Sequence, residues 1–200
     1  LQLGIPKGAV IRPAPAPPGR PVVVYGSSIV QGGCASRPGM AYPAILGRWL
    51  DVPVINLGFS GSGRGEAEVA TLIAEIDASV FVLDSLPNMT DEQVTERIPG
   101  FIATLRNKHP RTPIVLVENI TYQHAWLHAP VNARSKKNNV LKALAEPLMQ
   151  KDPLLSYVSG ETLLGDDSEA TVDGTHPTDL GFRRMAEAIR PALAAALAGK

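Results

Sequence analysis

VVVYGSS, at residues 22–28, is the stretch that decides the fold. Its β-branched residues make both faces of an extended chain apolar, which is typical of a parallel strand buried under helices. The run ends at Gly26, and Ser28 follows on a tight turn before the pair Gly32-Gly33. A hydroxyl residue at the end of a buried strand is a candidate nucleophile.

Four further segments are short, apolar and rich in β-branched residues: 53–57, 80–83, 114–117 and 154–158. Stretches with helical spacing lie between them, and one begins with a capping-box pattern at residues 90–93. This alternation predicts an α/β fold, a three-layer α/β/α sandwich with a five-stranded parallel sheet. In such a sheet the functional residues gather beyond the carboxyl ends of the strands.

The composition narrows the class of protein. The chain has 200 residues, 44% of them hydrophobic, which suits one domain with a substantial core. Basic and acidic residues number 19 each, so the formal net charge is zero, which argues against a nucleic-acid partner. No apolar run approaches the roughly 18 residues of a membrane span. With no signal-peptide pattern either, no membrane partner is expected and the cytoplasm is the default location.

The first 20 residues differ from the rest. Residues 1–11 alternate loosely between apolar and polar, and residues 12–21 contain five prolines. A proline-rich segment is stiff and extended, as linkers often are. We therefore expect residues 1–20 to be the last strand of an upstream segment plus a linker, and residues 21–200 to be the catalytic domain.

DGTHP, at residues 173–177, offers the base that a serine nucleophile needs. Of the four histidines, His176 alone stands beside a carboxylate in a loop expected at the functional edge. Asp173 can orient the imidazole through Nδ1 and leave Nε2 to take the Ser28 proton. Asp166 and Asp167 are rival carboxylates, farther from His176 along the chain.

An acyl-transfer reaction also needs fixed donors for the developing oxyanion. The backbone N–H of Ser28 is one candidate. The glycine-rich turn at residues 56–63 offers a second, because glycine allows the backbone to come close to a ligand. The side-chain amide of Asn88, which follows the third predicted strand, is a third.

These motifs resemble those of the SGNH, or GDSL-type, hydrolases, and the resemblance runs from Pro21 to the C-terminus. The first block of that family, usually Gly-Asp-Ser, corresponds to residues 26–28, with Ser28 as the nucleophile. The last block, Asp-x-x-His, corresponds to Asp173 and His176. Residues 25–43 and 87–90 look like one bacterial subgroup, in which a β-rich domain often precedes the hydrolase domain.

The remaining blocks match less fully. The glycine of the second block corresponds to Gly61, with Gly58 as the alternative, and the asparagine of the third block corresponds to Asn88. The rest of the third block, Gly-x-Asn-Asp, is replaced here by Leu86 and Met89. Ser27 replaces the aspartate of the first block, which is not a member of the catalytic triad.

The resemblance implies a serine esterase that works through an acyl-enzyme on Ser28, with Asp173 and His176 completing the triad. Ser28, Gly61 and Asn88 would form the oxyanion hole, and no metal or organic cofactor would be needed. The expected partner is a small-molecule or carbohydrate ester with a short acyl group, acetyl in the first place. An acyltransferase would use the same triad. A flavodoxin-like module binding a phosphate ligand at residues 26–33 is a further alternative, which leaves Asp173 and His176 without a role.

The segment 121–139 reads as a long polar loop and is a candidate for substrate selection. Within it His124 and His128 stand four residues apart, so they could share a metal ion if the segment were helical. No third ligand is evident in the sequence, and we do not expect a metal site there.

Overall fold

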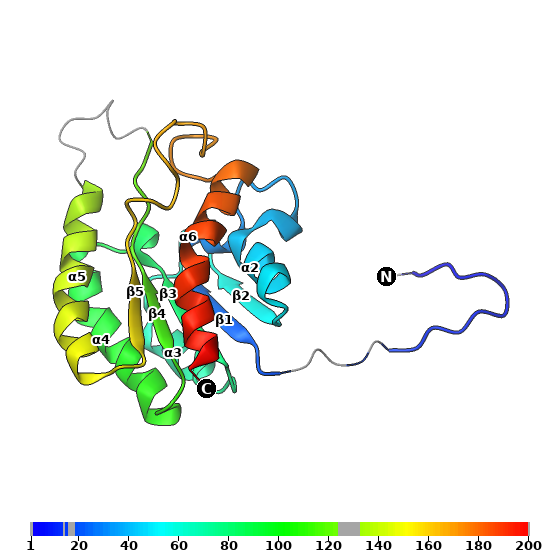
Figure 1. Ribbon diagram of the computed structural model, residues 1–200, viewed down its shortest axis with the longest axis horizontal. Helices are drawn as coiled ribbons and strands as arrows, with labels where there is room; N and C mark the ends of the chain where they lie inside the picture. Colours follow the sequence, from blue (N-terminus) through cyan, green and yellow to red (C-terminus); the bar gives the residue numbers. More distant parts are fainter. Residues whose placement is uncertain (1, 14, 16–18, 124–132, 200) are drawn as a thin grey trace.

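A parallel sheet forms the centre of the molecule, seen in a computed structural model that describes residues 2–13, 15, 19–123 and 133–199 (Figure 1). Its five strands lie in the order β2-β1-β3-β4-β5. They are β1 (Val22–Gly26), β2 (Val54–Gly58), β3 (Val80–Asp84), β4 (Ile114–Val117) and β5 (Leu155–Val158). Each strand begins and ends within one residue of its predicted position, so the predicted α/β class and five-stranded sheet are confirmed.

Helices cover both faces of this sheet, which gives the predicted three layers (Figure 1). One face is covered by α2 (Tyr42–Leu50) and α6 (Asp179–Ala198). The other is covered by α3 (Ala67–Ile73), α4 (Asp91–Lys108) and α5 (Ala133–Lys151). Three short helices connect these elements: α1 (Ser28–Gln31) and the 3-10 helices η1 (Pro38–Met40) and η2 (Leu86–Asn88).

Strand β1 lies inside the core because it has a neighbouring strand on each side and a helical layer on each face. Val22 and Val24 pack against the layer of α2 and α6, whereas Val23 and Tyr25 pack against the opposite layer. None of the four is more than 1% exposed. Burial on both faces explains why the run is continuously apolar rather than alternating.

The capping box predicted for residues 90–93 is present at the start of α4. The Thr90 side chain accepts from the backbone N–H of Gln93, and the Gln93 side chain accepts from the backbone N–H of Thr90. Two donors that a helix end leaves without partners are thereby satisfied.

The prediction of a loop over 121–139 is wrong at its end, because α5 begins at Ala133. The first turns of this helix are polar in sequence, so the pattern does not show that one of their side chains is buried. Asn138 is 5% exposed, accepts from the backbone N–H of Asn119 at 3.0 Å and donates to the Asn119 carbonyl at 2.9 Å. A buried asparagine that satisfies backbone groups takes a place where the sequence pattern expects an apolar residue. His124 and His128 lie outside the described residues.

Residues 2–13 carry no helix or strand and are exposed, and the division of the chain into an upstream segment and a catalytic domain stays a prediction. An isolated strand has no neighbour to pair its backbone groups, so the alternating pattern alone does not form one. Among the described helices, none combines the length and apolar character that crossing a membrane requires.

Three loops meet at one edge of the sheet because their strands are neighbours and run parallel. Gly26 at the end of β1 is in register with Gly58 at the end of β2 and with Asp84 at the end of β3. The segments that follow these residues carry Ser28, Gly61 and Asn88. The fold therefore brings to one edge three residues that the sequence separates by up to 60 positions.

Candidate active site

Ser28 is held at the point where β1 passes directly into α1. The turn depends on Gly26, because a Cβ atom there would lie 2.1 Å from the Asp84 carbonyl oxygen. Ser27 is buried and caps α1 by accepting from the backbone N–H of Ile29 at 3.2 Å. Ser28 is the first residue of the helix, a position whose backbone N–H has no partner inside the helix.

The structure brings Ser28, His176 and Asp173 together in one hydrogen-bonded series. The distance between Ser28 Oγ and His176 Nε2 is 3.0 Å. On the other side of the ring, His176 Nδ1 lies 2.7 Å from Asp173 Oδ2. An ionised carboxylate can only accept hydrogen bonds, so Nδ1 carries the proton. In the neutral ring Nε2 is then an acceptor, and the Ser28 hydroxyl donates to it.

The electrostatics of Asp173 suit this arrangement. Burial on its own would raise the pKa of Asp173. Hydrogen bonds from the backbone N–H and ring of His176 and from the backbone N–H of Thr175 outweigh burial and hold the pKa at about 2. The carboxylate is therefore ionised at neutral pH and accepts the hydrogen bond from His176 Nδ1.

The loop that carries Asp173 and His176 is closed at its base. Thr171 and Pro177 form an isolated antiparallel bridge, and the backbone N–H of Val172 donates to the His176 carbonyl at 2.8 Å. A second support comes from the segment after β4, where the backbone N–H of Gln123 donates to the Gly174 carbonyl at 2.9 Å. Residues 171–177 are thus held in a defined shape before any substrate arrives.

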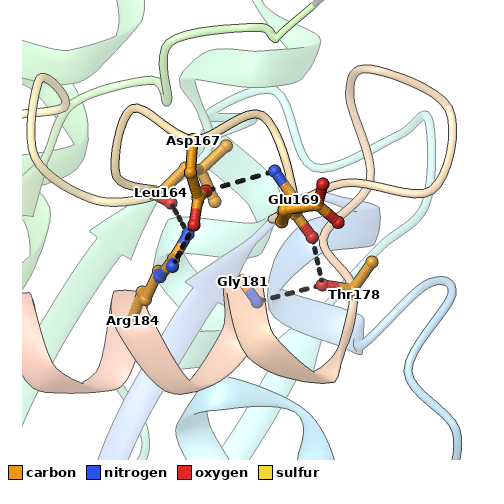
Figure 2. Close-up of polar contacts among 6 residues, drawn as sticks. All are labelled: Leu164, Asp167, Glu169, Thr178, Gly181 and Arg184. Carbon is orange, nitrogen blue, oxygen red and sulfur yellow. Dashed lines mark hydrogen bonds and ion pairs between the residues drawn. The ribbon is translucent and has the colours of Figure 1, made fainter.

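The rival carboxylate Asp167 faces a different partner, Arg184 of α6 (Figure 2). Each oxygen of the Asp167 carboxylate accepts from one guanidinium nitrogen at 2.6 Å, and Arg184 also donates to the Leu164 carbonyl at 3.0 Å. The Arg184 hydrogen bonds lower the pKa of Asp167 to about 2. Asp167 therefore fastens its loop to α6, and Asp173 is the carboxylate that contacts His176.

Gly61 and Asn88 lie on the loops after β2 and β3, the strands on either side of β1. The backbone φ of Gly61 is +68°, a value that residues other than glycine rarely adopt. The Asn88 amide donates to the Phe59 carbonyl at 3.2 Å and so ties η2 to the loop of Gly61. A side-chain amide has two N–H donors, so the second can serve another acceptor.

Sequence reasoning missed two residues that adjoin this site. A Cβ atom on Gly33 would lie 3.5 Å from both Ser28 Cβ and His176 Cδ2, so Gly33 packs against the pair. Asp84, at the end of β3, is 2% exposed and accepts from the Tyr42 hydroxyl at 2.8 Å. Burial raises the pKa of Asp84 to about 8. A carboxylate closing an apolar run was the one signal in the sequence that could have pointed to it.

Within the described part of the chain, no group of three or more His, Cys, Asp and Glu side chains is arranged to hold a metal ion.

The chain is similar in sequence and in structure to known proteins. The family described as "GDSL-like Lipase/Acylhydrolase" matches residues 19–194. A solved structure from Bacteroides ovatus ATCC 8483, described as a GDSL-like lipase, has a TM-score of 0.90 at 42% identity. The match covers 97% of this chain and 58% of that one, so the chain spans little more than half of its relative. No curated protein sequence matches the chain.

Two more distant structures share the fold. A family two carbohydrate esterase from Clostridium thermocellum, in complex with cellohexaose, has a TM-score of 0.73 at 14% identity, covering 94% of this chain and 67% of that one. A carbohydrate acetylesterase family member from Sinorhizobium meliloti has a TM-score of 0.63 at 16% identity, covering 90% of this chain and 100% of that one. At such identities the likeness shows the fold alone.

Proposed function

This chain belongs to the GDSL-like lipase/acylhydrolase family, and we propose that it is a serine esterase that hydrolyses short-chain acyl esters, acetyl esters above all, through an acyl-enzyme on Ser28. The observation that carries the proposal is the series of hydrogen bonds from Ser28 Oγ through the His176 ring to Asp173. A nucleophile, a base and a group that orients the base are the parts that acyl transfer requires.

The first half of the reaction acylates the serine. Ser28 Oγ attacks the ester carbonyl while His176 Nε2 accepts the hydroxyl proton. Asp173 holds the ring in the required tautomer and stabilises the imidazolium that forms. His176 then returns the proton to the departing alcohol, and the acyl group remains on Ser28.

The oxyanion of the tetrahedral intermediate needs hydrogen-bond donors around the former carbonyl oxygen. The backbone N–H of Ser28, the backbone N–H of Gly61 and the second N–H of Asn88 are the candidates, since the carboxyl ends of β1, β2 and β3 lie side by side. Loss of one such donor typically lowers kcat by about 10²–10³-fold.

Water completes the cycle by attacking the acyl-enzyme, with His176 again acting as the base. The His176 side chain is 31% exposed and that of Asp173 is 49% exposed. This accessibility to solvent supports hydrolysis rather than transfer to another alcohol. An open site also suits an acyl group carried on a bulky alcohol such as a sugar, and the carbohydrate esterases with this fold are in line with such a substrate.

The test compares hydrolysis of p-nitrophenyl acetate, butyrate and octanoate by the wild type and by Ser28→Ala. We expect the acetate to be the best substrate and Ser28→Ala to lose nearly all activity, because the remaining groups have no nucleophile. Ser79→Ala is the matched control. Ser79 is buried just before β3, at the amino ends of the strands and therefore away from Ser28, and its hydroxyl has no partner among the described residues. Equal rates for wild type and Ser28→Ala would refute the serine mechanism.

The same assay with an added alcohol separates hydrolysis from acyl transfer. Methanol or glucose competes with water for the acyl-enzyme, and the two products are told apart by chromatography. Acetate as the main product at moderate alcohol concentrations is the expected result. Predominant formation of the new ester would identify an acyltransferase.

A further inference from the structure

One carboxylate, Glu66, organises the loop between β2 and α3 that carries Gly61. Both of its oxygens accept from the backbone N–H of Arg64, at 3.0 and 3.1 Å. Its Oε2 also accepts from the Tyr25 hydroxyl at 2.6 Å. That hydroxyl in turn accepts from the backbone N–H of Gly65 at 2.9 Å. Glu66 thus connects the end of this loop to Tyr25 of β1, three residues before Ser28.

Arg64 extends the connection from Glu66 to Gly61 itself. Its guanidinium group donates to the Gly61 carbonyl at 2.8 Å. The carbonyl of Arg64 accepts from the Arg97 guanidinium of α4 at 3.0 Å, which fixes the other side of the same residue. A backbone segment held at its N–H, its carbonyl and its side chain has little freedom to rotate.

The other end of the loop is anchored to the strand that leads to the nucleophile. The backbone N–H of Phe59 donates to the Gly26 carbonyl at 2.9 Å, and the Phe59 carbonyl accepts from the Asn88 amide at 3.2 Å. The peptide between Ser60 and Gly61 therefore lies between an anchor at Phe59 and an anchor at Arg64. Its N–H direction depends on both.

We propose that Glu66 and Arg64 are positioning residues that hold the Gly61 N–H in the direction that the oxyanion requires. The inference rests on the proposed function, since it assigns these residues a part in that reaction. Neither side chain touches the reacting atoms. Glu66 fixes the backbone of Arg64, and Arg64 fixes the carbonyl side of Gly61. An oxyanion donor works only when its geometry is set before the charge develops.

The protonation states agree with this assignment. Burial opposes the charge on Glu66, but the hydrogen bonds from Tyr25 and Arg64 outweigh burial and lower the pKa of the carboxyl. Burial and the Glu66 carboxylate raise the pKa of Tyr25, so its hydroxyl remains a donor. The network therefore persists over the pH range in which an esterase is assayed.

The test measures kcat and KM for p-nitrophenyl acetate in Glu66→Ala and Arg64→Ala. We expect kcat to fall by about tenfold to hundredfold in each, because a misdirected donor loses much of its effect on the transition state. KM is expected to stay within about twofold, since the oxyanion does not exist in the ground state. Glu68→Ala and Arg111→Ala are matched controls: both residues are exposed, and neither belongs to this network.

A transition-state analogue separates positioning from a general loss of structure. A short alkyl boronic acid forms a tetrahedral adduct with an active serine, so its inhibition constant reports on the oxyanion site. In each variant we expect the inhibition constant to rise by the factor by which kcat falls. The melting temperature should stay within a few degrees of that of the control variants. The double variant should be little worse than either single variant, because both act through one peptide.

The outcomes are distinguishable. If kcat and boronate affinity are unchanged in folded Glu66→Ala and Arg64→Ala, the positioning inference is wrong while the esterase assignment stands. A rise in KM alone would also overturn it. If the wild type neither hydrolyses esters nor binds the boronate, both the proposed function and the positioning role of Glu66 and Arg64 are wrong. Should Glu66→Ala not fold, Arg64→Ala carries the test by itself, because Arg64 is exposed and its side chain makes the contact with the Gly61 carbonyl.

Discussion

Asp173 contacts its histidine through both carboxylate oxygens. Oδ2 faces the ring Nδ1 at 2.7 Å, while Oδ1 accepts from the backbone N–H of His176 at 2.6 Å and of Thr175 at 2.9 Å. The backbone contacts fix which oxygen faces the ring. These local backbone contacts set the orientation of the carboxylate, and the carboxylate in turn orients the imidazole.

Asp173→Asn tests this orientation. The backbone N–H groups would keep the amide oxygen on their side, so the amide NH₂ would face Nδ1 and require that nitrogen to be an acceptor. The proton would then sit on Nε2, which could no longer accept from Ser28. We expect kcat to fall by about 10²–10⁴-fold with little change in KM, measured with p-nitrophenyl acetate.

Asp166→Asn and Asp167→Asn are the controls for that substitution, because these two residues are the rival carboxylates in the sequence. Asp166 is exposed, and Asp167 is engaged with Arg184. Both variants should keep kcat within a few-fold of wild type. A loss in Asp167→Asn as large as that in Asp173→Asn would contradict the assignment.

At the scale of elements, the start of α6 serves as the anchor of the loop that carries the base. Thr178 caps the helix by accepting from the backbone N–H of Gly181 at 3.2 Å, and its hydroxyl donates to the Glu169 carbonyl at the same distance (Figure 2). Its backbone N–H donates to the Ala170 carbonyl at 2.9 Å. Thr178 thus joins the start of α6 to residues 169 and 170, where the loop of Asp173 and His176 begins.

Thr178→Ala is expected to cost about 1 kcal/mol in the free energy of unfolding, the usual value of an N-cap. Because the loop also loses its tie to Glu169, kcat should fall by about threefold to tenfold. Urea unfolding and steady-state kinetics measure the two effects. Thr104→Ala is the control, since Thr104 is a half-buried residue of α4 whose hydroxyl donates to the Gly100 carbonyl of the same helix. Full activity in a destabilised Thr178→Ala would show that the tie is irrelevant to the base.

At the scale of the whole molecule, the fold could be predicted because each strand of the sheet has a recognisable pattern in its own short stretch of sequence. Each strand is a short β-branched run buried on both faces, and Ser28, Asp173 and His176 lie in compact motifs at strand or helix ends. The residues that sequence reasoning missed act through contacts made only after folding. Gly33 packs on His176 across 143 positions, and Asn138 in the polar first turns of α5 pairs with Asn119. No periodicity reports such contacts.

The buried carboxyl group of Asp84 makes the stability of the folded protein depend on pH. It is buried at the end of the central strand β3, beside Gly26, with the Tyr42 hydroxyl as hydrogen-bond donor. Burial raises its pKa in the folded state to about 8, whereas a carboxyl in the unfolded chain titrates near 4. The folded protein therefore binds this proton more tightly than the unfolded chain. Stability contributed by the neutral form is full below about pH 4 and is lost as the pH rises toward 8.

Asp84→Asn removes this titration while keeping the shape of the side chain and an acceptor for Tyr42. Each pKa unit corresponds to about 1.4 kcal/mol, so a few kcal/mol of the wild-type stability should disappear between pH 5 and pH 9. The variant should lack this slope and become the more stable of the two at high pH. Urea unfolding at both pH values measures the difference, with Asp166→Asn as an exposed control. Parallel pH profiles for wild type and Asp84→Asn would mean that the buried carboxyl is already ionised in the folded protein at low pH, and that Tyr42 and its surroundings compensate the charge.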